Sequence, residues 1–123
     1  MLSLSQGIQV YMAIDPVDLR KGFDGLSAAV QTVFERNVLS GHLFLFLNRR
    51  RDRIKLLWWD EDGLAIFYKR LERGSYEVPC HLPGAKQLQL SSAQLSLLLS
   101  GVQLDSVKHR RRYKLAQSAA SGT

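Results

Sequence analysis

The sequence has few of the residues that support secreted, fibrous or membrane folds. A single cysteine, Cys80, rules out an internal disulfide, and three prolines and nine glycines are too few for a low-complexity chain. No apolar run approaches the roughly 18 residues that a membrane helix needs. The N-terminus lacks the basic and long apolar regions of a signal peptide. We therefore expect a cytoplasmic protein without membrane partners.

The apolar content is sufficient for one domain. The chain has 123 residues, of which 46% are hydrophobic, and it contains no internal repeat. Residues 106–123 have no apolar period and consist of a basic run followed by Ala, Ser and Gly. We predict a single domain over residues 1–105 and a basic, disordered C-terminal arm over residues 106–123.

Positive charge is concentrated in two short segments. The net charge is +6, yet residues 49–55 and 108–114 together carry +9. The rest of the chain has seven basic and ten acidic residues, a net charge of −3. A mildly acidic body with two basic patches is typical of proteins that bind nucleic acid, although anionic membranes and acidic protein surfaces also attract such patches.

Apolar runs of strand length predict a block of consecutive strands. A first short strand is expected over residues 8–13, and three more over 43–47, 54–59 and 64–71. In the last of these the side chains alternate, so even-numbered and odd-numbered residues face opposite sides of the sheet. Residues 76–78 have the composition of a further short strand, which Pro79 would end.

Two helices are expected, one before and one after this block. Asp18 is a plausible N-cap for a helix of about four turns that ends near Asn37. Ser91 and Gln94 have the form of a capping box for the second helix, with Gly101 at its C-terminus. The apolar stripes comprise Leu19, Phe23, Leu26, Val30 and Val33 in the first, and Leu95, Leu98 and Leu99 in the second. The predicted fold is α+β, a small antiparallel β-meander with helices on one face and a basic hairpin tip.

The basic hairpin tip, defined as Arg49, Arg50, Arg51 and Arg53, is the strongest candidate site. Such a loop could be merely solvated and protect the sheet from aggregation. Four arginines in five positions favour phosphate contact instead, because the guanidinium fork makes two parallel hydrogen bonds to phosphate oxygens. A β-ribbon fits the major groove of DNA and arginines also enter a narrow minor groove, so the mode of contact stays open. Lys55 extends the tip.

Other basic and aromatic residues are secondary candidates for the same contact. Strand neighbours face opposite sides, so Lys69 and Arg70 cannot both serve one surface, whereas Tyr68 and Arg70 share a face. Either both tryptophans, Trp58 and Trp59, are covered by packing, or one is exposed for base stacking or a partner. The basic candidates are Lys69, Arg70 and Arg73, together with Lys108, Arg110, Arg111, Arg112 and Lys114 of the arm, whose alternative role is solubility.

The sequence offers no convincing catalytic or metal site. Asp60, Glu61 and Asp62 precede Gly63 in a tight turn, where Gly63 is expected to take a positive φ and the carboxylates diverge. The three histidines and Cys80 lack the spacing of a zinc site. There is no glycine-rich phosphate loop or nucleophile motif. We expect no enzyme activity, no metal and no cofactor.

Several motifs together resemble a known family. DLRKGFDGL at 18–26 and YKRLERG at 68–74 combine with GHLF at 41–44, NRR at 48–50, Lys55, Trp59-Asp60 and Asp62-Gly63. This pattern resembles the accessory protein of insertion sequence 66 elements over about residues 8–101. That protein is the product of the element's second open reading frame, also called TnpB, and is distinct from the RNA-guided nuclease of the same label. Leu19 replaces the family's usual Met, residues 37–39 replace a Pro-containing loop, and the arm lies outside the shared core.

The resemblance implies a bacterial mobile element and a role in transposition beside a separate, larger DDE transposase, without catalytic residues of its own. Combined with the basic tip, it predicts a non-catalytic accessory protein that binds the element's DNA. An alternative is an adaptor that docks on the transposase near Trp59 and Tyr68 without binding DNA. A third possibility is a small metal-dependent nuclease that uses Asp60 and Asp62. The oligomeric state and the choice between double-stranded DNA, single-stranded DNA and RNA stay open.

Overall fold

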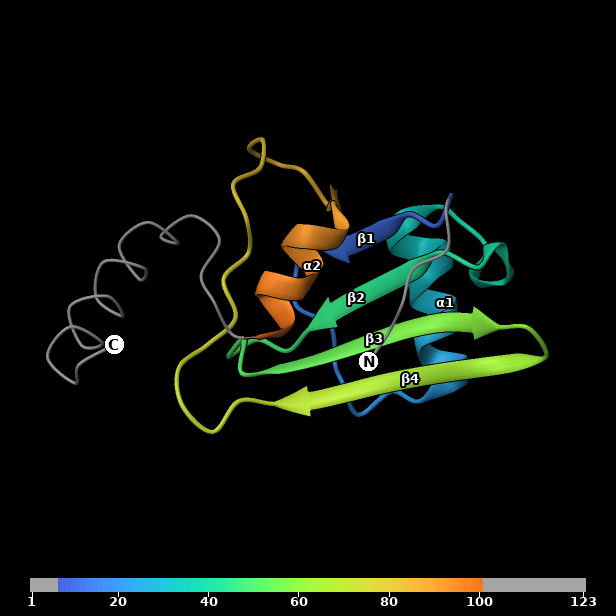
Figure 1. The fold of residues 1–123 in the computed structure, drawn as a ribbon, viewed down its shortest axis with the longest axis horizontal. Helices are drawn as coiled ribbons and strands as arrows, with labels where there is room; N and C mark the ends of the chain where they lie inside the picture. Colours follow the sequence, from blue (N-terminus) through green and yellow to red (C-terminus); the bar gives the residue numbers. More distant parts are fainter. Residues whose placement is uncertain (1–6, 101–123) are drawn as a thin grey trace, which may run out of the picture.

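A five-stranded sheet with one helix on each side forms the fold (Figure 1). The structure is a computed structural model that describes residues 7–100. The strands lie side by side in the order β4-β3-β2-β1-β5. In chain order the elements are β1 (Val10–Ala13), α1 (Phe23–Phe34), the 3-10 helix η1 (Val38–Ser40), β2 (Leu43–Leu47), β3 (Arg53–Asp60), β4 (Gly63–Arg70), β5 (Gln87–Leu90) and α2 (Ser92–Leu99).

The sheet is mixed rather than purely antiparallel. Strands β2, β3 and β4 form the predicted antiparallel meander. Strand β1 instead pairs in parallel with β2, with Val10 opposite Leu43, and β5 pairs antiparallel with β1. A parallel pair needs a crossover connection, and here α1 and η1 lie within that connection. The predicted α+β class is confirmed, while the prediction of an all-antiparallel sheet is wrong for β1.

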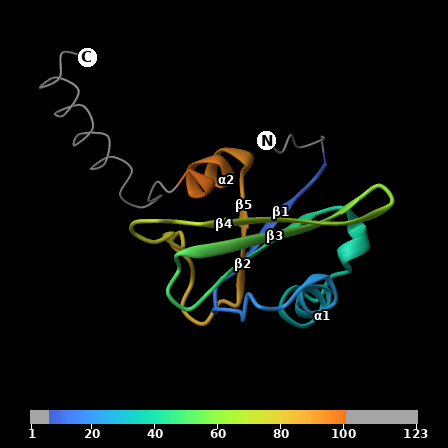
Figure 2. The same cartoon turned by 90° about the horizontal axis from the view of Figure 1, so that it is seen from below.

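The two helices cover opposite faces of the sheet (Figure 2). On one face Leu26, Val30 and Phe34 of α1 pack with aromatic residues of β1 and β2. On the other face Leu95 and Leu98 of α2 pack with the remaining core side chains of the strands. The expectation of helices on one face is therefore wrong. The physical reason is the LFLFL sequence of β2, whose five residues are all buried, so both of its faces need cover.

Helix α1 is shorter at both ends than predicted. It begins at Phe23 after Gly22, so Asp18 is not its N-cap; Asp18 binds Arg20 instead. Phe23 is 49% exposed, whereas Leu19 is buried from the preceding loop. The helix ends at Phe34.

Helix α1 stops there because the backbone of Glu35 turns left-handed. Glu35 has a φ of 53°, and its N–H still donates to the carbonyl oxygen of Gln31. That conformation, favoured by Gly and costly for Glu, ends the helix before the expected Asn37.

The remaining differences concern short segments. Residues 76–78 form no strand, although Tyr76 and Val78 are buried in the core on the α2 side. Strand β5, Gln87–Leu90, was not predicted, although its sequence alternates between Gln and Leu. At the β3–β4 turn Glu61 takes the positive φ, 57°, that was expected of Gly63.

Helix α2 follows the sequence prediction closely. The Ser91 hydroxyl accepts from the Gln94 N–H at 3.1 Å, and the Gln94 side chain accepts from the Ser91 N–H at 2.9 Å. This is the predicted capping box. The helix ends at Leu99, and Gly101 lies outside the described residues.

Packing of α2 on the sheet predicts an asymmetric response to truncation of adjacent leucines. Leu98 is 0% exposed and Leu97 is 38% exposed. Replacing Leu98 by Ala should lower the free energy of unfolding by about 2–4 kcal/mol, because it removes buried methyl groups and leaves a cavity. Leu97→Ala, the matched control, should cost less than about 1 kcal/mol. Urea unfolding followed by circular dichroism measures both; equal losses would contradict this packing.

Candidate nucleic-acid interface

The turn between β2 and β3 is built around Asn48. Its side-chain nitrogen donates to Asp52 Oδ1 at 2.6 Å, and its side-chain oxygen accepts from the Arg53 N–H at 3.0 Å. The Asn48 carbonyl oxygen also accepts from the N–H of Arg51, whose φ is 59°. The hydrogen bond from Asn48 lowers the pKa of Asp52, and the charges of Arg50 and Arg53 act in the same direction. The turn therefore holds one carboxylate close to the charges of Arg50 and Arg53.

The segment that follows β4 also holds the basic tip in place through backbone hydrogen bonds. The Leu71 N–H donates to the Asp52 carbonyl oxygen at 2.7 Å, and the Tyr76 N–H donates to the Arg51 carbonyl oxygen at 2.6 Å. Tyr76 is buried in the core, which anchors this segment. The backbone of the tip is thus attached to the body of the domain rather than projecting as a free loop.

The arginine side chains of the tip point to solvent. Arg49, Arg50, Arg51 and Arg53 are all exposed. The ion pairs within residues 7–100 involve the basic residues Arg20, Arg70 and Lys86, and none of the four tip arginines. Within residues 7–100, therefore, no ion pair occupies these guanidinium groups, although the charges of Arg50 and Arg53 also act on Asp52.

A second basic feature continues from the tip along the α1 side of the sheet. We define the α1-side cluster as Arg53, Lys55 and Tyr68. Arg53 Nη1 donates to the Tyr68 hydroxyl at 3.2 Å, and Lys55 Nζ lies 4.9 Å from the centre of the Tyr68 ring. Lys55 Nζ also donates to the Lys21 carbonyl oxygen at 2.9 Å, next to the start of α1. Two cations and a half-exposed phenol ring are thus held on one surface.

A groove of about 450 Å³ separates the α1-side cluster from the loop that precedes α1. Its polar lining includes Arg20, Arg50 and Asp18 in addition to the cluster. Arg20 is paired with Asp18 at 2.8 Å, and the hydrogen bonds from Arg20 hold the pKa of the Asp18 carboxyl at about 2. The charge of Arg20 is therefore largely neutralised. Arg50, Arg53 and Lys55 supply the remaining positive charges of the groove, which outnumber the one further carboxylate in its lining, Asp52.

A larger hollow lies elsewhere and lacks this chemistry. It measures about 670 Å³ and runs beside α1 and η1, where Ser27, Gln31, Glu35 and Asn37 line it together with Arg36. Arg36 stacks on the Tyr11 ring with its guanidinium carbon 4.1 Å from the ring centre. We therefore place the candidate site at the basic tip and not in this larger hollow.

The structure separates the other predicted site residues into distinct positions. Lys69 faces the α2 side and its Nζ donates to the Leu99 carbonyl oxygen at 2.7 Å, so it stabilises the end of α2. Arg70 pairs with Glu72 at 3.1 Å, and Arg73 is exposed. The arm candidates Lys108, Arg110, Arg111, Arg112 and Lys114 lie outside the described residues.

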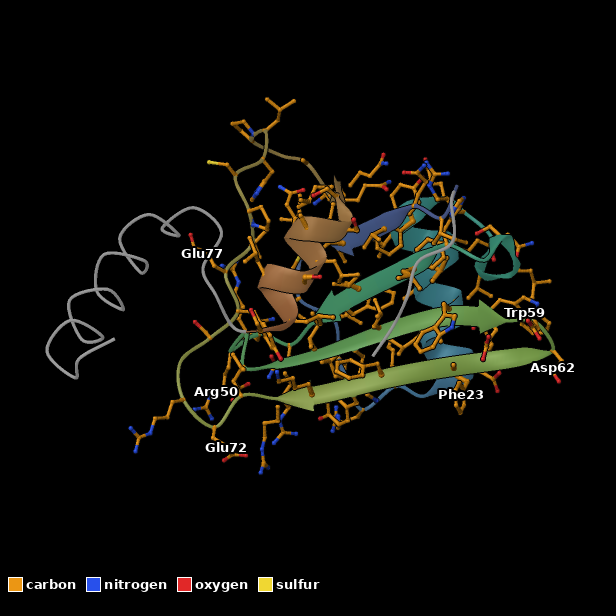
Figure 3. The ribbon with its side chains drawn as sticks, in the orientation of Figure 1. Phe23, Arg50, Trp59, Asp62, Glu72 and Glu77 are labelled. Carbon is orange, nitrogen blue, oxygen red and sulfur yellow. The ribbon has the colours of Figure 1, made fainter. Side chains whose placement is uncertain are left out.

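The two tryptophans do not join the tip. Trp58 is half-buried against the core on the α2 side, and Trp59 is half-buried on the α1 side. Figure 3 shows Trp59 and Arg50 at opposite ends of β3. The rise along a strand puts about 20 Å between the levels of Arg53 and Trp59. Tyr68, in contrast, contacts the tip arginine Arg53 through its hydroxyl.

Three contributors to the site were missed by the sequence prediction. Asn48 and Asp52 flank Arg49, Arg50 and Arg51 as turn-forming residues, a signal that was available in the sequence. Arg20 reaches the groove through the loop from β1 to α1, which sequence spacing alone did not place beside the hairpin. Among residues 7–100 no group of three or more His, Cys, Asp or Glu side chains is arranged to hold a metal ion.

Comparisons with known proteins give the setting of these residues. A family model described as "IS66 Orf2 like protein" matches residues 8–109. An uncharacterized protein of Sinorhizobium fredii, y4hO, is 41% identical over 102 residues, which cover 83% of this chain and 87% of the relative. A second uncharacterized protein of the same organism, y4jC, is 34% identical over 110 residues, or 89% of this chain and 92% of the relative.

Two negative findings accompany these matches. No solved structure gives a significant match to the chain. Within residues 7–100, no helix has the length and apolar character required to cross a bilayer.

The pairing of Arg20 with Asp18 predicts a coupled titration. Arg20→Gln should raise the Asp18 pKa from about 2 toward its ordinary value of 3.8, because the charged hydrogen bonds are lost. Since the folded-state pKa is depressed, the stability that this pair contributes is present above about pH 4 and is lost as the pH falls toward 2. Carboxyl NMR titration measures the shift, and Arg36→Gln is the control. An unchanged Asp18 pKa in Arg20→Gln would show that Arg20 is free to bind anions.

Proposed function

Because the chain belongs to the IS66 Orf2-like protein family, which implies an accessory role in an insertion sequence, we propose that it is a non-catalytic transposition protein that binds the element's DNA. The basic tip and the α1-side cluster make the contact. The observation that carries this proposal is the set of four exposed arginines outside any ion pair of residues 7–100, on a turn fixed to the core. This function would place the protein in the bacterial cytoplasm, beside the element's larger DDE transposase.

Arginine chemistry supports phosphate as the group that is bound. A guanidinium makes two parallel hydrogen bonds to phosphate oxygens, and contacts of this kind position a protein on DNA without reading its sequence. A fixed turn loses little conformational freedom on binding, so more of the interaction energy appears as affinity. Tyr68, 49% exposed beside Arg53, adds a hydroxyl and a ring face to the same surface.

The geometry favours contact along the DNA backbone over insertion of the hairpin into the major groove. A bare two-stranded ribbon enters that groove, but here the residues after β4 are hydrogen-bonded along one side of the tip. The tip is therefore broader than a ribbon. The cations that continue along the α1 side, Arg53 and Lys55, would instead follow the phosphates, which gives binding with little sequence preference and strong salt dependence.

A second candidate function is an adaptor that docks on the transposase without contacting DNA. It is favoured by the half-buried aromatic surface of Trp59, at the end of β3 remote from the tip. In that case the arginines would meet an acidic patch of the transposase. Co-purification with the transposase after nuclease treatment, together with no binding of naked DNA by the wild-type protein, would favour the adaptor.

The proposal predicts a defined loss of DNA affinity. Replacing Arg49, Arg50, Arg51 and Arg53 by Ala should weaken binding of duplex DNA more than about 100-fold at low salt, and reduce the log–log salt slope by about 4. Fluorescence anisotropy at several salt concentrations measures both quantities. Circular dichroism checks that the variant is folded.

A matched pair of double variants separates position from total charge. Arg49→Ala with Arg50→Ala removes two charges from the tip, and Arg36→Ala with Lys86→Ala removes two charges elsewhere. The tip variant should lower the salt slope by about 2, and the control by much less. All variants retain the C-terminal arm, so its contribution cancels. Wild-type affinity in the quadruple variant would reject the tip as the binding site.

A further inference from the structure

Strand β4 lies at one edge of the sheet, and its outward backbone groups can be assigned. Arg53 lies opposite Arg70 in the β3–β4 pair, so the next residues along, Asp52 and Leu71, also lie opposite each other. The Leu71 N–H donates to the carbonyl oxygen of Asp52. Hydrogen bonding alternates along an antiparallel pair. The odd-numbered residues of β4 therefore bond to β3, and the even-numbered ones, Leu64, Ile66 and Tyr68, direct their N–H and C=O groups away from the sheet.

Within residues 7–100, this edge lacks the usual protection against pairing with another strand. Natural edges are short, bulged, or carry proline and outward lysine. Strand β4 has eight residues, contains no proline, and pairs with β3 in unbroken register. Its one lysine, Lys69, does not protect the edge, because its ammonium group donates a hydrogen bond to the Leu99 carbonyl oxygen. Its apolar side chains are incompletely covered, since Leu64 and Ile66 are half-buried, and Phe67 and Tyr68 are 36% and 49% exposed.

The two ends of this edge carry opposite charges. The turn before β4 presents Glu61 and Asp62, both exposed, and the end of the strand presents Arg70, which pairs with Glu72 within the chain and would exchange that partner for Asp62 of a neighbouring copy. An antiparallel neighbour with the same sequence would place its basic end beside the acidic end of this strand. The edge is thus complementary to itself.

We propose that β4 pairs antiparallel with β4 of a second copy of this chain, about a two-fold axis at Ile66. This axis is perpendicular to the sheet, so the α1 side of one copy lies on the same side as the α1 side of the other. The two five-stranded sheets together form one ten-stranded sheet. In this register Ile66 meets its own counterpart, Leu64 lies opposite Tyr68 of the second copy, and Asp62 lies opposite Arg70 of the second copy. About six main-chain hydrogen bonds join the outward-directed groups.

Charge and hydrogen bonding together select this register. A shift by one residue would set outward-directed groups against residues that are already bonded to β3. A shift of the axis to Phe67 would place Asp62 opposite Glu72, which is a like-charge pair. Of these registers, the one centred on Ile66 keeps β4 paired over nearly its full length with opposite charges at both ends.

The pairing would also double the basic surface. Both α1-side clusters would lie on the same face of the extended sheet, and strand spacings put their Arg53 residues about 30 Å apart. That distance is close to one turn of B-DNA, about 34 Å. The dimer itself is independent of the DNA-binding proposal, because it is measured without nucleic acid.

A charge-reversal cycle tests the register. Sedimentation of the full, nuclease-treated chain between about 1 and 200 μM should show a monomer–dimer equilibrium. Asp62→Arg and Arg70→Asp should each weaken dimerisation about tenfold, since each creates two like-charge contacts per dimer. The double variant should return to within about threefold of wild type. Asp15→Arg is the matched control. Asp15 lies near the opposite edge of the sheet, so this change should leave the dimerisation constant unchanged.

Amide hydrogen exchange provides an independent readout. The N–H groups of Ile66 and Tyr68 should become protected as protein concentration rises, whereas those of Ala65 and Phe67 are protected at all concentrations by β3. A monomer throughout the concentration range would overturn the proposal. The edge of β4 would then be available to pair only with a strand of another protein. A dimer that is indifferent to both single charge reversals would overturn it as well.

Discussion

Burial of β2 on both faces is the constraint that organises this fold. Its sequence, LFLFL, provides no polar side chain that could face water, and all five residues are buried. One face is covered by α1 through an aromatic cluster in which the Phe34 and Phe44 rings lie 5.1 Å apart. The other face is covered by α2 and by the chain around Tyr76. The same requirement fixes the basic tip, because Tyr76 anchors the segment that hydrogen-bonds to Arg51 and Asp52.

The site follows from this arrangement. The turn at Asn48 leaves the central strand and presents the arginines at one end of the sheet, while the register between β3 and β4 brings Tyr68 beside Lys55. The loop before α1 closes the groove with Asp18 and Arg20. Positive charge therefore projects from a stiff, apolar framework, and membership in the IS66 Orf2-like family gives that surface its proposed place in an insertion sequence.

Much of the fold was predictable because local patterns agreed with the tertiary structure. The meander, the capping box at Ser91 and the exposed tip followed from apolar runs, turn residues and charge. The predictions failed where contacts between residues far apart in the sequence determine the structure. Periodicity extended α1 back to Asp18, whereas the helix begins at Phe23 and Asp18 pairs with Arg20 in the preceding loop. The continuous apolar run of β2 was a signal for two covered faces, and therefore for helices on opposite sides. Lys69 was predicted to contact nucleic acid because of its charge, but its ammonium group donates to the Leu99 carbonyl oxygen at the end of α2.

The central claim is that the basic tip and the α1-side cluster form one nucleic-acid surface. The most direct test is titration of the ¹⁵N-labelled protein with short duplex DNA, observed through backbone amides and arginine side-chain Nε–H signals. The account predicts that the signals of Arg49, Arg50, Arg51 and Arg53 shift together with those of Lys55 and Tyr68, and that the hollow beside α1 and η1 is unaffected. Shifts confined to that hollow or to β5, with the tip arginines unchanged, would contradict it.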